Sequence, residues 1–70
     1  MGEWIDAESS NLQRFMYNEG SQTLTVEFKN GVVYEYYDVP ASIYEGLLTA
    51  GSKGSYLYHN IKGSYRYSKQ

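Results

Sequence analysis

The chain has 70 residues, a net charge of −2, nine tyrosines and no cysteine, so it has room for one domain that buries only about 60% of the surface of its unfolded chain. Disulfides and thiolate metal sites are excluded, and the core or a partner subunit must supply the stability. No apolar stretch approaches the roughly 20 residues of a membrane span, and no signal peptide is evident. We therefore expect a cytoplasmic protein without a membrane segment.

The charges divide the chain into two parts. Before Gly46 there are eight acidic and two basic residues, a net charge of −6, whereas from Gly46 onward there are four basic residues and no acid, a net charge of +4. Such an asymmetry points to a partner-binding surface. The alternative is that both parts fold together and their charges complement each other.

The N-terminal part is predicted to enter a sheet. Residues 1–8 form either a loose segment or an edge segment, and Trp4 lies either in the core or at the surface. Asn11 to Tyr17 has strand-forming content with imperfect alternation, which is typical of a strand that carries a bulge. Thr23 to Phe28 and Val32 to Tyr37 alternate more regularly and predict two further strands.

Two registers are open to the hairpin between these last two strands. A two-residue Asn30-Gly31 loop would pair Phe28 with Val33 and place Glu35 among apolar side chains. A three-residue loop with its glycine in the left-handed conformation pairs Phe28 with Val32 instead. The large apolar side chains then share one face: Leu24, Val26, Phe28, Val32, Tyr34 and Tyr36. We therefore predict the three-residue loop.

A helix is predicted from about Pro40 to Ala50. Proline suits the first helical position because it has no amide hydrogen to leave unpaired, so Pro40 is expected there. Gly46 costs about 1 kcal/mol relative to alanine inside a helix, which indicates close packing at that point. The apolar stripe that would cover the sheet consists of Ile43, Tyr44, Leu47 and Leu48.

A second short helix is predicted from about Ser52 to Lys62, with Ser52 as its cap and Gly63 as its end. Tyr65 to Tyr67 alternates as a short strand would. The predicted fold is therefore α+β: an antiparallel three-stranded meander, extended by a short C-terminal strand and packed on one face by the first helix. Residues 9–67 would form a single domain and 68–70 a C-terminal tail.

Several motifs, in order, resemble the KTSC domain from about Ser9 to Tyr67. They are Ser9-Ser10-Asn11, Thr23-Leu24-x-Val26-x-Phe28, Tyr34-x-Tyr36-x-x-Val39-Pro40, Tyr44 with Leu47 and Ala50, Ser52-Lys53-Gly54, Asn60-Ile61-Lys62 and Tyr65-x-Tyr67. The family motif falls on Tyr34, Tyr36, Val39 and Pro40. The resemblance implies a small bacterial or phage protein related to a domain at the C-terminus of some lysyl-tRNA synthetases. The family has no established activity, and an RNA-binding role has been suggested for it. Leu57-Tyr58 departs from the Phe-Asn common in relatives.

The sequence offers no catalytic or metal-binding constellation. His59 is the only histidine, so neither a nucleophile with a base nor a clustered metal site is indicated. The segment Gly51-Ser52-Lys53-Gly54-Ser55 lacks the glycine spacing of a phosphate-binding loop. We expect a protein that is not an enzyme and needs no cofactor or metal.

Cations and aromatic rings interleave in the C-terminal part, a combination that holds RNA or another single strand through phosphates and stacked bases. The candidate residues are Lys53, Tyr56, Tyr58, His59, Lys62, Tyr65, Arg66 and Tyr67. The net negative charge opposes binding unless the charges segregate onto separate faces. The alternatives are tyrosines that complete the core, or a module that forms homodimers or docks on a larger protein, since tyrosine and arginine are also enriched in interface hot spots.

Overall fold

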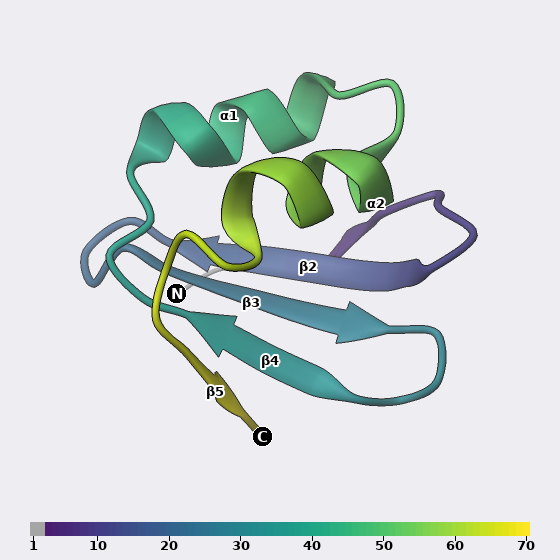
Figure 1. The fold of residues 1–70 in the computed structure, drawn as a ribbon, viewed down its shortest axis with the longest axis horizontal. Coiled ribbons are helices and arrows are strands. Elements are labelled where there is room, and N and C mark those ends of the chain that lie inside the picture. The colour runs from purple at the N-terminus through teal and green to yellow at the C-terminus, as the bar shows by residue number, and fades with distance from the viewer. Residues whose placement is uncertain (1–2) are drawn as a thin grey trace.

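A five-stranded antiparallel sheet in the order β1-β2-β3-β4-β5 carries the helices on one face (Figure 1). The structure is a computed structural model and describes residues 3–70. The strands are β1 (Ile5–Asp6), β2 (Leu12–Asn18), β3 (Thr23–Phe28), β4 (Val33–Tyr36) and β5 (Tyr67–Lys69). The helices are α1 (Ala41–Thr49) and α2 (Lys53–Tyr56), which continues into a one-turn π-helix, η1 (Leu57–Ile61). The predicted α+β fold is confirmed, and β1 is an additional edge strand.

The hairpin between β3 and β4 has the predicted three-residue loop. The backbone amide of Phe28 donates to the carbonyl of Val32 over 2.9 Å, and Gly31 has a φ of 89°. Within the sheet Leu24 therefore lies opposite Tyr36. The register of β2 shifts between Leu12 and Arg14, which confirms the predicted bulge.

The core lies between the helices and the covered face of the sheet. Leu47 of α1 and both Leu57 and Ile61 of η1 are buried, and they belong to the same apolar cluster as Phe15 and Val26 of the sheet. Burial of side chains this large stabilises a small fold by roughly 1.5–3 kcal/mol each. The predicted stripe therefore faces the sheet, except that Leu48 at its edge is 38% exposed.

The start of α1 differs from the prediction by one residue. Pro40 has a ψ of 153°, which is extended, and α1 begins at Ala41. The carbonyl of Pro40 nevertheless accepts from the amides of Ile43 and Tyr44, over 3.0 and 3.2 Å. Pro40 is thus the N-cap and not the first helical residue, because a cap already accepts the first helical bond while its own backbone stays extended.

The second helix is confirmed as α2 and η1 together. The hydroxyl of Ser52 accepts from the amide of Ser55 over 3.4 Å and caps α2. The last turn widens, since the amide of Lys62 donates to the carbonyl of Leu57, five residues earlier, over 2.8 Å. Both Leu57 and Ile61 are buried in this turn, and Gly63, with a φ of 89°, ends the segment as predicted.

The C-terminal strand exists, but its predicted position is wrong by two residues. The turn after η1 uses Gly63 in the left-handed region, and Tyr65 packs against the core before any strand forms. The first ladder bond runs from the amide of Tyr37 to the carbonyl of Arg66, over 2.9 Å. The strand β5 therefore starts at Tyr67 and includes Ser68 and Lys69.

Candidate nucleic-acid interface

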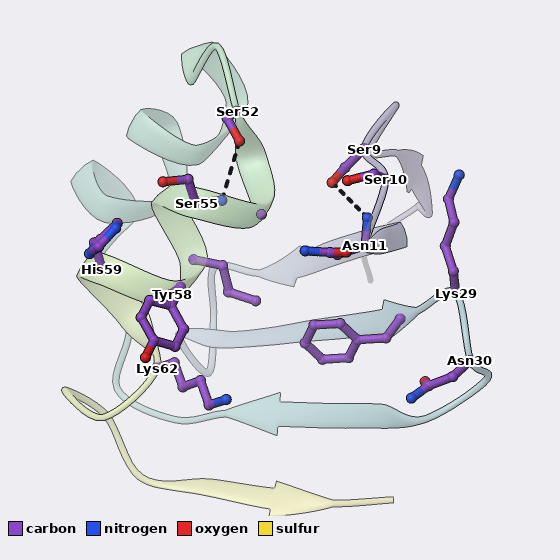
Figure 2. A pocket seen from close by; sticks show the side chains of 13 residues that line it. Ser9, Ser10, Asn11, Lys29, Asn30, Ser52, Ser55, Tyr58, His59 and Lys62 are labelled. Atoms are coloured by element: carbon purple, nitrogen blue, oxygen red, sulfur yellow. Dashed lines mark hydrogen bonds between the residues drawn. The ribbon is translucent and has the colours of Figure 1, made fainter.

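An open groove of about 650 Å³ lies between the α2–η1 segment and the adjoining ends of β2 and β3. Phe28 and Leu57 are the large apolar residues in its lining. Figure 2 shows Tyr58, His59 and Lys62 along one side and Lys29 with Asn30 at the far end. The other lining residues are small and polar: Ser9, Ser10, Asn11, Ser52, Gly54 and Ser55.

One wall of the groove is formed by two segments far apart in the sequence, the Ser9-Ser10-Asn11 turn and the start of α2. The hydroxyl of Ser9 accepts from the amides of Asn11 and Leu12, over 3.2 and 3.4 Å, and folds this segment into a turn. A Cβ atom on Gly54 would lie 3.2 Å from that hydroxyl, so a glycine lets α2 approach the turn. The amide of Lys29 donates to the carbonyl of Asn11 over 2.9 Å and holds the β3–β4 loop beside the same wall.

The opposite wall presents an aromatic ring together with a cation. Tyr58 is 62% exposed, and the ammonium nitrogen of Lys62 lies 5.4 Å from the centre of its ring. The ring of His59 meets that of Tyr58 edge-on at a centroid distance of 5.3 Å. The turn of η1 thus brings together three of the residues that the sequence singled out, at a distance suited to cation–π contact.

Aromatic rings continue from the groove across the sheet. The ring of Tyr34 lies 5.6 Å from that of Phe28, and the ring of Tyr67 lies 5.6 Å from that of Tyr34. Lys69 is paired with Tyr34 in the ladder, so its side chain emerges on the same face. Figure 1 shows α1 and α2 above β2, whereas β5 forms the opposite edge of the sheet.

Five of the candidate residues do not line the groove. The hydroxyl of Tyr56 donates to the carbonyl of Ile43 over 3.1 Å beneath α1, and Tyr65 packs against the core. The ammonium of Lys53 contacts the carbonyl of Ala50 over 3.5 Å. The guanidinium of Arg66 contacts the carboxylate of Asp38 over 3.3 Å and lies 5.6 Å from the ring of Tyr37. Tyr58, His59 and Lys62 line the groove, and Tyr67 contacts the ring of Tyr34 on the same face of the sheet.

Sequence reasoning missed Phe28, Lys29, Tyr34 and Lys69 as surface residues of the same face. The first three lie far from the basic C-terminal part in the sequence, and Lys69 falls in the predicted C-terminal tail. The period-2 alternation of β3 and β4 was the available signal, because it already placed Phe28 and Tyr34 on one face. Only the pairing of β5 with β4 brings Lys69 to them.

Acidic side chains are absent from the lining of the groove, although the chain is net negative. Glu27 is paired with Arg14, and Glu35 accepts from the hydroxyl of Tyr37 over 3.2 Å; both alternate to the other face of the sheet. Glu19 and Glu45 line a separate hollow at the Tyr17 end of α1. Within residues 3–70, no ion pair involves Lys29, Lys62 or Lys69. These three lysines are therefore separated from the carboxylates, whereas Arg14 and Arg66 are paired with acidic residues.

Burial raises the pKa of Tyr36 above its usual value of about 10, and the neighbouring phenols of Tyr34 and Tyr67 raise it further. The phenol of Tyr36 is therefore neutral at physiological pH. The centre of its ring lies 5.7 Å from the centre of the exposed Tyr67 ring. The phenol adds no negative charge to this face.

Residues 8–65 match the sequence profile of the KTSC domain. The chain belongs to the KTSC family. The KTSC chain is 44% identical over 65 residues to lysine–tRNA ligases of Trichormus variabilis and Nostoc punctiforme, and these residues are 93% of this chain but 12% of each ligase. It is 38% identical over 64 residues to an uncharacterized protein of Stutzerimonas stutzeri, covering 90% of each chain.

The fold of this KTSC domain is shared with a solved structure. A crystal structure of a KTSC domain protein from Yersinia pestis superimposes with a TM-score of 0.93 at 25% identity, covering 100% of this chain and 99% of that one. Over residues 3–70, no helix is long and apolar enough to cross a lipid bilayer. In the same part of the chain, no group of three or more His, Cys, Asp or Glu side chains is arranged to hold a metal ion.

Proposed function

We propose that this KTSC domain is a non-enzymatic module that binds single-stranded nucleic acid, RNA in particular, weakly and in the groove. The observation that carries the proposal is the arrangement of Tyr58 with Lys62 on one wall and Lys29 at the far end, in a lining without an acidic residue. An exposed ring offers a stacking surface to a base, and two ammonium groups offer contacts to phosphates.

The exposed ring favours an unpaired strand over a duplex. A base within a helix stacks on its neighbours and has no face free for Tyr58, whereas an unpaired base does. The small polar side chains of Ser10, Asn11 and Ser55 line the groove and suit hydrogen bonds to base edges and ribose hydroxyls. The similarity to proteins named lysine–tRNA ligases supports a setting in which RNA is handled.

The small number of cations limits the affinity. Each phosphate neutralised on a single strand contributes about −0.7 to the slope of log K against log salt. Two lysines in the groove therefore predict a slope of about −1.4, much less than that of strongly basic binding domains.

Titration of an unstructured RNA of about ten nucleotides, at two salt concentrations, tests the proposal. Tyr58→Ala should lower the affinity about tenfold through the loss of stacking, and Lys62→Ala should reduce the salt slope by about 0.7. Arg14→Gln removes the same charge from the opposite face and is the matched control. Equal losses in Lys62→Ala and Arg14→Gln, or binding that does not respond to salt, would contradict the proposal.

A second candidate function is protein docking through the uncovered face of the sheet. The guanidinium of Arg14 lies 4.1 Å from the centre of the Trp4 ring, and Trp4 is 37% exposed. Tryptophan and arginine are the residue types most enriched in interface hot spots. Sedimentation at increasing concentration, with and without Trp4→Ala, tests self-association through this face, and a constant monomer mass excludes a homodimer over that range.

A further inference from the structure

The groove does not end at Phe28. Its lining ring is 5.6 Å from the ring of Tyr34 on the next strand, and Tyr34 is 5.6 Å from Tyr67 on the strand after that. Both contacts are edge-on, at 85° and 71°. Three strands thus carry a continuous row of rings that leads from the groove to the edge of the sheet.

The far end of this row repeats the chemistry of the groove. Tyr67 is 58% exposed, close to the 62% of Tyr58, and each ring is accompanied by a lysine. Lys62 lies over Tyr58, and Lys69 is two residues from Tyr67 on the same strand, so the two side chains share a face. A cation beside an exposed ring is the combination that holds one nucleotide.

No acidic side chain separates the two ends of the row. Glu35 lies between Tyr34 and Tyr36 in β4 and alternates to the other face. Asp38, beyond the end of β4, contacts Arg66. A negatively charged backbone therefore meets no carboxylate between Phe28 and Lys69 within the ladder.

We propose that the strand bound in the groove continues over Phe28 and Tyr34 and reaches a second stacking position at Tyr67, with Lys69 at the phosphate beyond it. This inference rests on the proposed function and extends it from one nucleotide-binding position to two. The recognised ligand is then an unpaired segment long enough to span from η1 to β5, and a short oligonucleotide fills only one of the two positions.

A length series tests the extension. The probes are unstructured RNAs of about four and about ten nucleotides, within the usual span of single-strand sites. Tyr67→Ala should lower the affinity for the longer RNA about tenfold and leave that for the shorter one nearly unchanged. Lys69→Gln should reduce the salt slope of the longer RNA alone, by about 0.7.

Matched controls on the other face are Trp4→Ala for the loss of a ring and Arg14→Gln for the loss of a charge. Tyr67→Ala also removes a contact within the fold, because Tyr67 packs against Tyr36. Lys69→Gln removes a charge from the same strand without altering the aromatic contacts. The inference is overturned if both variants weaken the two RNAs equally, or if neither affects the longer one while Tyr58→Ala still weakens both. Failure of every RNA to bind overturns the proposed function and the inference together.

Discussion

The hydroxyl of Tyr56 occupies the place where a side chain at position 46 would begin. A Cβ atom on Gly46 would lie 2.2 Å from that oxygen and 2.7 Å from the ring carbon that carries it. The same hydroxyl donates to the carbonyl of Ile43 over 3.1 Å. The glycine thus allows α2 to pack against α1, and it turns Tyr56 away from the candidate interface.

Gly46→Ala should destabilise the domain by about 1–3 kcal/mol through overpacking, although alanine favours a helix by about 1 kcal/mol. In a Tyr56→Leu background the obstructing ring is gone, so the same substitution should be neutral or stabilising. Urea unfolding of the wild type, the two single variants and the double variant gives the coupling energy between positions 46 and 56. Independent, additive effects of the two substitutions would show that the ring does not restrict position 46.

Gly31→Ala should lower the free energy of unfolding by about 1 kcal/mol, because Gly31 has a φ of 89°, which strains a residue with a Cβ atom. No atom lies within 4 Å of the new Cβ, so this conformational strain is the only effect that the substitution adds. Gly51 is the control: its Cβ would also meet nothing within 4 Å, and its φ is not positive. Gly51→Ala should be neutral or slightly stabilising. Thermal unfolding of both variants decides the matter, and equal losses would contradict the assignment of strain to the loop.

Stability should fall as the pH rises above about 10. The pKa of Tyr36 is raised in the folded state by burial and by its neighbours Tyr34 and Tyr67, so above pH 10 the unfolded chain releases this proton while the folded chain retains it. The stabilisation that Tyr36 contributes is fully present below the pKa of Tyr36 in the unfolded chain. It is lost as the pH rises through the higher pKa of Tyr36 in the folded state. Tyr36→Phe should flatten the decline in unfolding free energy between about pH 9 and 12, and an unchanged slope would refute this account.

Arg66→Ala should leave RNA binding within about twofold of wild type, because Arg66 faces Asp38 and the ring of Tyr37. It should also change stability by less than about 1 kcal/mol, as expected for an exposed ion pair. Lys62→Ala removes the same charge from the groove wall and should weaken salt-dependent binding instead. A loss for Arg66→Ala that matches the loss for Lys62→Ala in the same titration would count against the placement of the interface.

Local rules predicted much of the fold. The choice of the three-residue loop followed from keeping Glu35 away from Leu24 and Val26, and Gly31 adopts the conformation that this loop requires. The capping of α2 by Ser52 and the close packing at Gly46 also follow from short stretches of sequence. For the loop and the cap the determining groups are near neighbours in the chain or in one hairpin, whereas the partner of Gly46, the ring of Tyr56, comes from another helix.

The candidate interface depended on contacts that sequence spacing does not express. The C-terminal part contains four tyrosines from Tyr56 onward that look alike in sequence. Tyr56 points under α1 and Tyr65 packs on the core, while Tyr58 and Tyr67 are exposed. What separates them is the wide turn of η1, which buries Leu57 and Ile61, and the start of β5 at Tyr67, after the turn at Gly63.

By itself, the sequence determined the α+β class, the hairpin register and the segregation of charge along the chain, because alternation, turn residues and composition act locally. Only the tertiary structure decided which rings and lysines share a face. Lys29, Lys62 and Lys69 come from a loop, the end of a helix and an edge strand, and they are brought to one side by strand pairing and core burial between residues distant in the chain.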